Sequence, residues 1–478
     1  MLAGQIKKLV RHSAIYGVGG LIQRLLAVAL LPLYLHYLSP SEYGSIETLV
    51  ALTTILFTLL RAAIQNSFFR FYFDSDDADY RRRIVRTSFW STMTSATFAL
   101  AAGLALADPI SRALFSTPAH ADLVRAAFVG LWASMNYDQL TALFRVEERS
   151  VSFSIASLAN VLVTIGATVL LVVFLDKGPL GVIVGNFTGT LAVYVVLLAY
   201  RRFQLGWEFD RGLFRTMLGF GWPFVPSVVA LSLIDFSDRF FIVKLDGLAD
   251  VGRYALGVRI ASALVFLLWA FRLAWPAFAY SIRDDSEARR AYSFVLTYVV
   301  LVGSWGALAL GLTSPWLVRL VGNPKFHEGS RVVAPLAFAA VAFGAYVVVV
   351  ISVGRMKRMA SNFVITGAAA LIAILLNLLL IPPFGIIGAA TATLSAYVAM
   401  FAGMTWKAQR VFPVPYQWRR VALAAGTAVA LTVVGKVLEV GLPAAVGLTL
   451  AYPFALLLLG FYLPAERARI GRLLPGAR

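Results

Sequence analysis

Four arginines lie inside apolar stretches of this sequence, where a fixed positive charge is costly. Arg24 lies in the run from Ser13 to Tyr34, about 16 Å along a helix that rises 1.5 Å per residue. An arginine at that depth in a bilayer costs at least ~2.5–3.5 kcal/mol, and a guanidinium does not lose its proton to escape this cost. Arg61, Arg259 and Arg272 lie in other apolar stretches. Several fixed cations at depth predict a site that receives an anion.

Carboxylates in or beside the apolar stretches are fewer, and two roles are consistent with them. Glu47, Asp138 and Asp235 could each neutralise a buried arginine, or bind a coupling proton or sodium ion. Asp235 and Arg239 are four residues apart, a spacing that lets them pair on one helix face. Glu47 and Arg61 also fall on nearly the same face of one predicted helix.

Other chemistries lack the residues that they need. The sequence has no cysteine, which excludes a disulfide framework, a thiolate metal site and a cysteine nucleophile. Its four histidines are scattered, and we find no Walker loop, paired-carboxylate site or nucleophile–base set. We therefore expect no enzyme, no cofactor and no metal. Several amides in the apolar stretches are expected to bind sugar hydroxyls or to link helices: Gln23, Gln65, Asn66, Asn136 and Gln139.

Composition indicates the elements that must position these residues. Of 478 residues, 60% are hydrophobic and only 14% are charged, whereas soluble domains carry about 25% charged residues. The mean hydropathy is +0.79. The apolar stretches are about 20 residues long without period-2 alternation, so they predict membrane helices rather than barrel strands. We expect an all-α integral membrane protein whose first apolar run, too long for a signal peptide, is a retained helix.

Basic residues give the orientation of about fourteen predicted spans. With the N-terminus in the cytoplasm, every inside segment carries at least two cations and no outside loop carries more than two. This obeys the positive-inside rule and places both termini in the cytoplasm. The net charge of +18 is therefore a sign of topology and of affinity for anionic membrane lipid, not for nucleic acid. The spans lie near 13–37, 43–65, 84–107, 122–144, 151–174, 180–200, 216–236, 252–276, 292–313, 331–353, 360–381, 386–408, 419–438 and 443–463.

Two local patterns recur at matching places and predict an internal duplication. The turn at 37–44 is similar to the one at 244–252, and 178–185 is similar to 382–388. Because six helices lie between them, the two units share one orientation, as in transporters built from parallel repeats. The predicted division is a six-helix lobe at 1–200, a cytoplasmic linker at 201–215, a second six-helix lobe at 216–408, and an appended helix pair with a cytoplasmic tail at 409–478.

Three segments carry a resemblance to a known family. The turn at 38–44, the stretch at 238–257 and the stretch at 377–393 resemble the polysaccharide-transporter branch of the multidrug/oligosaccharidyl-lipid/polysaccharide exporter superfamily. The Wzx-type flippases of lipid-linked oligosaccharides are the most similar members. The resemblance implies two lobes around a central cationic lumen that works by alternating access. It also implies transfer of an undecaprenyl-diphosphate-linked glycan from the inner to the outer leaflet of the bacterial cytoplasmic membrane.

The same resemblance implies a role in O-antigen, capsule or exopolysaccharide biosynthesis, with polymerase and chain-length partners. In the related peptidoglycan-precursor flippase, arginines on the first, second and eighth helices engage the diphosphate. Arg24, Arg61 and Arg259 lie on the matching helices here. We therefore expect these arginines, with Arg272, to bind the diphosphate.

Three other functions would need different residues or a different cargo. A peptidoglycan-precursor flippase would differ only in its cargo. A cation-coupled multidrug exporter of the same superfamily would need an acidic interior, whereas deep arginines outnumber deep carboxylates here. A membrane glycan polymerase or ligase would need a large catalytic outside loop, and every predicted outside loop is short. Since no ATP site is present, the energy is expected to come from an ion gradient, the membrane potential or consumption of the product.

Overall fold

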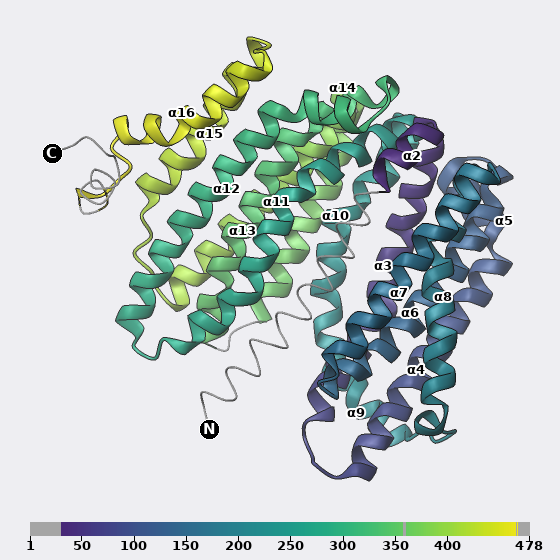
Figure 1. The fold of residues 1–478 in the computed structure, drawn as a ribbon. Helices are drawn as coiled ribbons and strands as arrows, with labels where there is room; N and C mark the ends of the chain where they lie inside the picture. Colours follow the sequence, from purple (N-terminus) through teal and green to yellow (C-terminus); the bar gives the residue numbers. More distant parts are fainter. Residues whose placement is uncertain (1–29, 357–359, 465, 467–478) are drawn as a thin grey trace. The chain divides into compact units, whose positions relative to one another are not determined.

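The computed structural model describes residues 30–356, 360–464 and 466, and all of its regular elements in these ranges are helices (Figure 1). The predicted all-α class is thereby confirmed for this part of the chain. Arg24 lies outside the described residues. The helices are α2 (Leu31–Tyr37), α3 (Pro40–Tyr72), α4 (Ala78–Ala105), α5 (Ala107–Phe115), α6 (Ala121–Val146), α7 (Ser150–Val169), α8 (Gly178–Leu205), α9 (Arg211–Gly221), α10 (Val225–Leu245), α11 (Leu248–Ser281), α12 (Asp285–Val321), α13 (Ser330–Arg355), α14 (Ala360–Val411), α15 (Trp418–Val437) and α16 (Leu442–Leu458).

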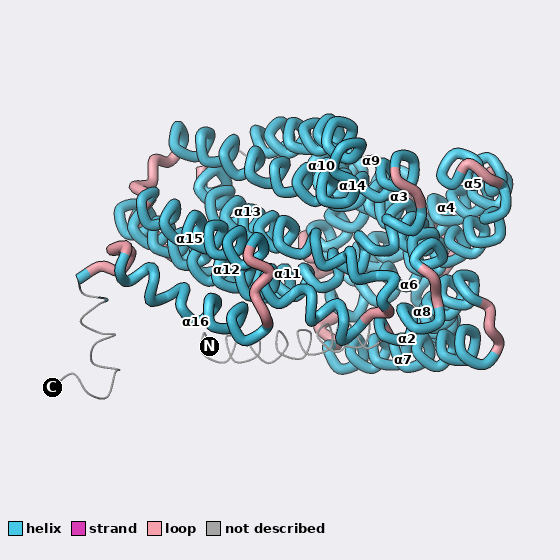
Figure 2. The backbone as a smooth tube through the Cα atoms, turned by 90° about the horizontal axis from the view of Figure 1, so that it is seen from above, coloured by secondary structure: helices cyan, strands magenta, loops and turns pink. Residues whose placement is uncertain are grey.

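Many of these helices match the membrane in length and polarity. Among the described residues, eight are long and apolar enough to cross a bilayer, and the bent pair α4 and α5, at 72°, would make a ninth. Short loops join consecutive helices (Figure 2). The protein is therefore a multi-pass membrane protein, while the number of fourteen spans stays a prediction.

Helix α14 contains a bend at the position where the sequence predicts a break between two spans. Gly385 has φ +56° and ψ −139°, a conformation that is strained for residues with a Cβ. Pro382 and Pro383 precede it and remove two backbone donors from the helix. The long helix is thus two helical segments that meet at Gly385, in keeping with the predicted spans at 360–381 and 386–408.

The chain forms two compact units. The first runs to Gly252 and includes Val321–Lys325, and the second contains Arg253–Leu320 and Phe326 onward. In the first unit, α3, α4, α6 and α8 surround a core that includes Phe68, Phe89 and Tyr194. Helices α9 and α10 also pack on α3. The first compact unit therefore continues beyond the predicted linker at 201–215.

The first of the two similar turns, at 37–44, forms the N-terminal cap of α3. Ser39 and Glu42 form a reciprocal cap: the Ser39 hydroxyl accepts from the Glu42 backbone N–H, and the Glu42 carboxylate accepts from the Ser39 backbone N–H. One turn later, a Cβ on Gly44 would lie 1.9 Å from the Leu248 carbonyl oxygen. A Cβ on Gly252 would likewise lie 2.1 Å from the Pro40 carbonyl oxygen. The two motif glycines thus allow the starts of α3 and α11 to cross in close contact.

Candidate functional site

Arg61 of α3 is buried in the interior of the first unit. Its side chain is 2% exposed, and its Nη1 donates to the Asp138 carboxylate of α6. Its Nη2 lies 3.5 Å from Gln139 Oε1, and the Phe57 ring covers the guanidinium at 5.2 Å. Arg61 therefore does not extend to a membrane surface, and its charge is held by an ion pair between two helices.

A second arginine shares the same carboxylate. Arg145 Nη2 lies 3.6 Å from Asp138 Oδ1, on the same helix. The Phe69 ring lies 5.0 Å and the Phe153 ring 5.9 Å from the Arg145 guanidinium. Both rings attract the cation through their π faces. Because two guanidiniums face one carboxylate, this group of side chains keeps an excess positive charge.

Amides and hydroxyls complete the surroundings of the ion pairs. Gln65 Nε2 lies 3.5 Å from Asp138 Oδ2. Gln139 Nε2 donates to the Ser88 hydroxyl at 3.0 Å, which links α6 to α4. We call Arg61, Gln65, Asp138, Gln139 and Arg145 the arginine cluster. Its side chains come from α3 and α6, and α4 fixes their arrangement.

The arginine cluster has hydrogen-bonding capacity that the described residues leave unused. The Nε and Nη2 atoms of Arg145 are buried and make no hydrogen bond within the described part of the chain. Buried donors without acceptors are costly, the more so on a charged group. An anion with several oxygen atoms would satisfy these donors and the excess charge together.

The other predicted arginines lie on a different element. Arg259 and Arg272 are exposed residues of α11, in the second unit. The Arg272 guanidinium lies 5.6 Å from the Phe343 ring of α13. The structure therefore places Arg61 in one compact unit and these two arginines in the other.

The predicted carboxylates are spread over three helices. Glu47 is buried in α3, Asp138 belongs to the arginine cluster, and Asp235 is exposed on α10. Arg239, the expected partner of Asp235, bonds to the Asp238 carboxylate at 2.7 Å and to the Asp235 backbone carbonyl at 2.7 Å. Arg61, which shares a helix with Glu47, has Asp138 as its carboxylate partner across the helix interface.

Arg145 is the site residue that the sequence prediction missed. It follows directly after the predicted span 122–144, so the sequence pattern assigns it to a cytoplasmic loop. Its spacing from Asp138 is the sign that could have found it: seven residues are two helical turns, which return to one face. Among the described residues, no group of three or more His, Asp or Glu side chains could hold a metal ion.

These features define a class: a multi-pass helical membrane protein with a buried cationic site. The chain belongs to the polysaccharide biosynthesis protein family, which matches residues 9–281. It is 23% identical over 237 residues to the amylovoran biosynthesis protein AmsL of Erwinia amylovora, a match that covers 49% of this chain and 61% of AmsL. The chain thus spans about three fifths of the length of this curated relative.

Two solved structures show the fold. The lipid II flippase MurJ in an inward closed conformation has a TM-score of 0.73 at 11% identity, with 92% of this chain and 98% of MurJ covered. An inward-facing multidrug resistance MATE family transporter of the MOP superfamily has a TM-score of 0.66 at 14% identity, with 81% and 94% covered. The relation to polysaccharide biosynthesis proteins that the sequence suggested is thereby confirmed, and the two solved structures have a similar fold.

Proposed function

We propose that the protein is a flippase that carries undecaprenyl-diphosphate-linked oligosaccharide from the inner to the outer leaflet of the bacterial cytoplasmic membrane. The product would serve O-antigen, capsule or exopolysaccharide biosynthesis. The polysaccharide family and the flippase fold support a lipid-linked glycan as cargo. The observation that carries the proposal is the arginine cluster, where the buried Arg61 and the partly buried Arg145 share one carboxylate.

The chemistry of the cargo fits the arginine cluster. A diphosphate cannot cross apolar lipid unaided, because its charges would lose their hydration. Guanidinium groups replace that hydration with paired, charge-assisted hydrogen bonds to phosphate oxygens. Asp138 orients Arg61 and offsets part of the positive charge, so that the diphosphate binds without being trapped. Gln65 supplies a further donor at the same place, and the Gln139 side-chain oxygen accepts from Arg61.

The remaining predicted residues belong to the same proposal. Arg24, Arg259 and Arg272 would bind the diphosphate at other stages of its passage. Glu47 and Asp235 would balance charge or bind a coupling proton or sodium ion, which would supply the energy. The lobes at 1–200 and 216–408 would move by alternating access, with the helix pair at 409–478 appended and both termini in the cytoplasm.

One observation favours a second candidate, a peptidoglycan-precursor flippase. The fold resembles that of the lipid II flippase MurJ over 92% of this chain. The two candidates share the diphosphate and differ in the sugar, so the arginine cluster serves both. A cation-coupled drug exporter fits less well, because the excess positive charge of the arginine cluster would repel a cationic drug.

Substitution of Arg145 tests the proposal. In a strain that lacks the chromosomal gene, we expect Arg145→Ala to reduce glycan export at least tenfold, because a charge-assisted contact to phosphate contributes roughly 1.5–3 kcal/mol. Lipid-linked oligosaccharide should accumulate on the inner leaflet, where mass spectrometry identifies its sugar. Arg145→Lys keeps the charge but lacks the planar guanidinium that can bond two phosphate oxygens at once, so it should restore part of the export.

Arg149→Ala is the matched control. Arg149 lies just after the end of α6, is half exposed, and pairs with Glu147 at 3.5 Å. Its removal takes the same charge from the same end of the helix but leaves the arginine cluster intact, so export should stay near the wild-type level. Normal export by a well-expressed Arg145→Ala protein would overturn the assigned role of the arginine cluster.

A further inference from the structure

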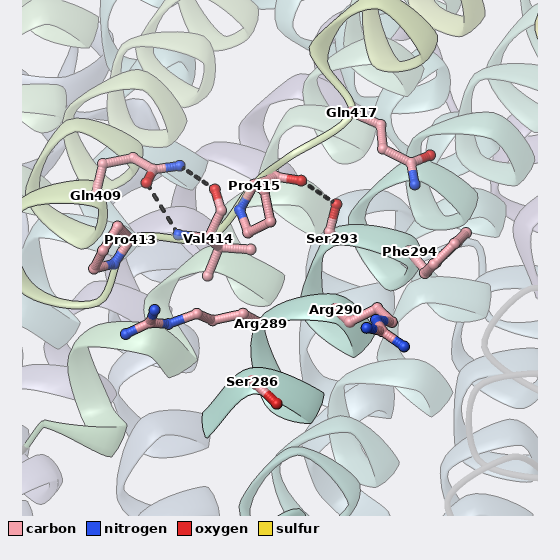
Figure 3. Close-up of a pocket in the computed structure, with 10 residues that line it drawn as sticks. All are labelled: Ser286, Arg289, Arg290, Ser293, Phe294, Gln409, Pro413, Val414, Pro415 and Gln417. Carbon is pink, nitrogen blue, oxygen red and sulfur yellow. Dashed lines mark hydrogen bonds between the residues drawn. The ribbon is translucent and has the colours of Figure 1, made fainter. Parts of the chain in front are cut away.

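A second basic site lies at one end of the second unit, whereas the arginine cluster belongs to the first unit. A pocket of about 670 Å³ lies between the first turns of α12 and the loop that joins α14 to α15. Arg289, Arg290 and Ser293 line it from α12, and Gln409 and Gln417 line it from the other side (Figure 3). The positive-inside pattern predicts that this end faces the cytoplasm.

The loop over the pocket is held in one shape. Gln409 Nε2 donates to the Val414 carbonyl at 2.7 Å, and the Val414 N–H donates to Gln409 Oε1 at 3.1 Å. The Ser293 hydroxyl donates to the Pro415 carbonyl at 2.6 Å. Figure 3 shows these bonds on one side of the pocket and the two arginines on the other. The pocket is therefore preformed, with little loop ordering left for a ligand to cause.

The charge of the pocket is not offset by nearby acids. Neither Arg289 nor Arg290 has an ion-pair partner among the described residues, and Arg289 Nε is buried without a hydrogen bond there. Three acids precede them: Glu287 forms no ion pair with either arginine among the described residues, and the other two have partners elsewhere. Asp285 pairs with Arg355 at 2.8 Å, and Asp284 accepts from the Glu287 backbone N–H at 2.8 Å. Two guanidiniums beside amide and hydroxyl groups suit a phosphate group.

Neighbouring aromatic residues indicate the level of the pocket in the membrane. Trp406 is 58% exposed and Trp418 is 42% exposed, one beside each end of the loop. The Arg410 guanidinium lies 3.9 Å from the Trp406 ring. Exposed tryptophans with basic residues are typical of the interface where lipid headgroups lie. A basic pocket between helices at that level is a site for an anionic lipid headgroup.

We propose that this pocket binds the phosphate of an anionic phospholipid through Arg289 and Arg290. This lipid site is separate from the cargo site and does not depend on the proposed flippase function. A bound lipid would join the start of α12 to the loop before α15 and thus hold this end of the second unit together.

The test is native mass spectrometry of the purified full-length protein in neutral detergent, titrated with dioleoyl phosphatidylglycerol. The double variant R289A/R290A should bind this lipid about 30-fold more weakly, since each basic residue near an anionic lipid contributes a factor of about five. The exposed Arg290 also permits R290E, which should lose binding without disturbing the Arg289 contact with Phe412 at 4.9 Å.

The matched control is R410A/R419A, which removes the same charge at the same end of the unit but no side chain that lines the pocket. It should bind the lipid within about twofold of wild type. Equal losses in the two double variants, or unchanged binding by R290E, would overturn the proposal. Equally tight binding of phosphatidylcholine would also overturn it, as would displacement of the lipid by millimolar inorganic phosphate, which would indicate a site for a free anion.

Discussion

Replacement of Asp138 by asparagine is the sharpest test of the arginine cluster. The substitution keeps the shape of the side chain but removes the negative charge that Arg61 and Arg145 share. Arg61 is only 2% exposed, whereas Asp138 is 31% exposed, so most of the Arg61 guanidinium stays out of reach of water when the carboxylate is lost. Removing one partner of a buried ion pair costs about 3–5 kcal/mol, because the other partner is left as an uncompensated buried charge.

That loss has a measurable size in thermal unfolding. For a unit of some 250 residues, 1 kcal/mol corresponds to about 2–4 °C in Tm, so Asp138→Asn should lower Tm by roughly 6–20 °C. Fluorescence-detected size-exclusion chromatography of heated detergent samples measures the shift. The double variant Arg61→Met with Asp138→Leu removes both charges and should recover much of the lost stability.

An exposed acid gives the control for the same chemical change. Asp122 pairs with Arg125 at 2.6 Å, but both side chains are exposed. Asp122→Asn should therefore change stability by less than about 1 kcal/mol. The reasoning is refuted if Asp138→Asn unfolds within about 2 °C of wild type, or if the double variant is less stable than the single one.

Two further predictions concern packing and pH. Gly44→Val should abolish export and reduce stability by at least ~1–3 kcal/mol, because its Cβ would overlap the Leu248 carbonyl oxygen. The control is Gly166→Val, which should export normally because nothing lies within 4 Å of the added Cβ. Equal export by the two variants would contradict this prediction. Burial raises the pKa of the Glu466 carboxyl, but hydrogen bonds and the Arg420 guanidinium lower it more, so the net pKa is below 4.5. The stability that Glu466 gives, roughly 1–3 kcal/mol, is then present above pH 4.5 and lost as the pH falls through the lowered pKa. Glu466→Gln should therefore reduce the fall of Tm between pH 7 and pH 3. An unchanged slope of Tm against pH would contradict this prediction.

The sequence predicts the helical membrane class well, because the polarity of a whole stretch decides whether it enters a bilayer. It also predicts the break in α14, where Pro382, Pro383 and Gly385 each disfavour a continuous helix. The 72° bend between α4 and α5 was not predicted. Gly103 lies just before the bend and Pro109 just after it, and both residues disfavour a continuous helix, so the sequence held a local sign of this bend.

The arginine cluster was predicted only in part, for a physical reason. Hydropathy indicates the depth of Arg61 but not the direction in which its side chain extends. Periodicity compares residues within one helix, and it suggested Glu47 as a residue on the same face. The carboxylate that pairs with Arg61 lies 77 residues away on α6, at a register set by the packing of α3 on α6. Such a pairing depends on tertiary structure, which a single sequence does not encode in its local pattern.

The two motif glycines lie where α3 and α11 approach each other closely. Gly44 faces the Leu248 carbonyl, and Gly252 faces the Pro40 carbonyl. Gly44 and Gly252 are equivalent positions of the two motifs, and so are Pro40 and Leu248. In each case the motif glycine faces a backbone carbonyl at the start of the other helix. Two helices that approach each other at a pair of glycines exchange such contacts by geometry, so the contact fits the proposed duplication, which stays a prediction.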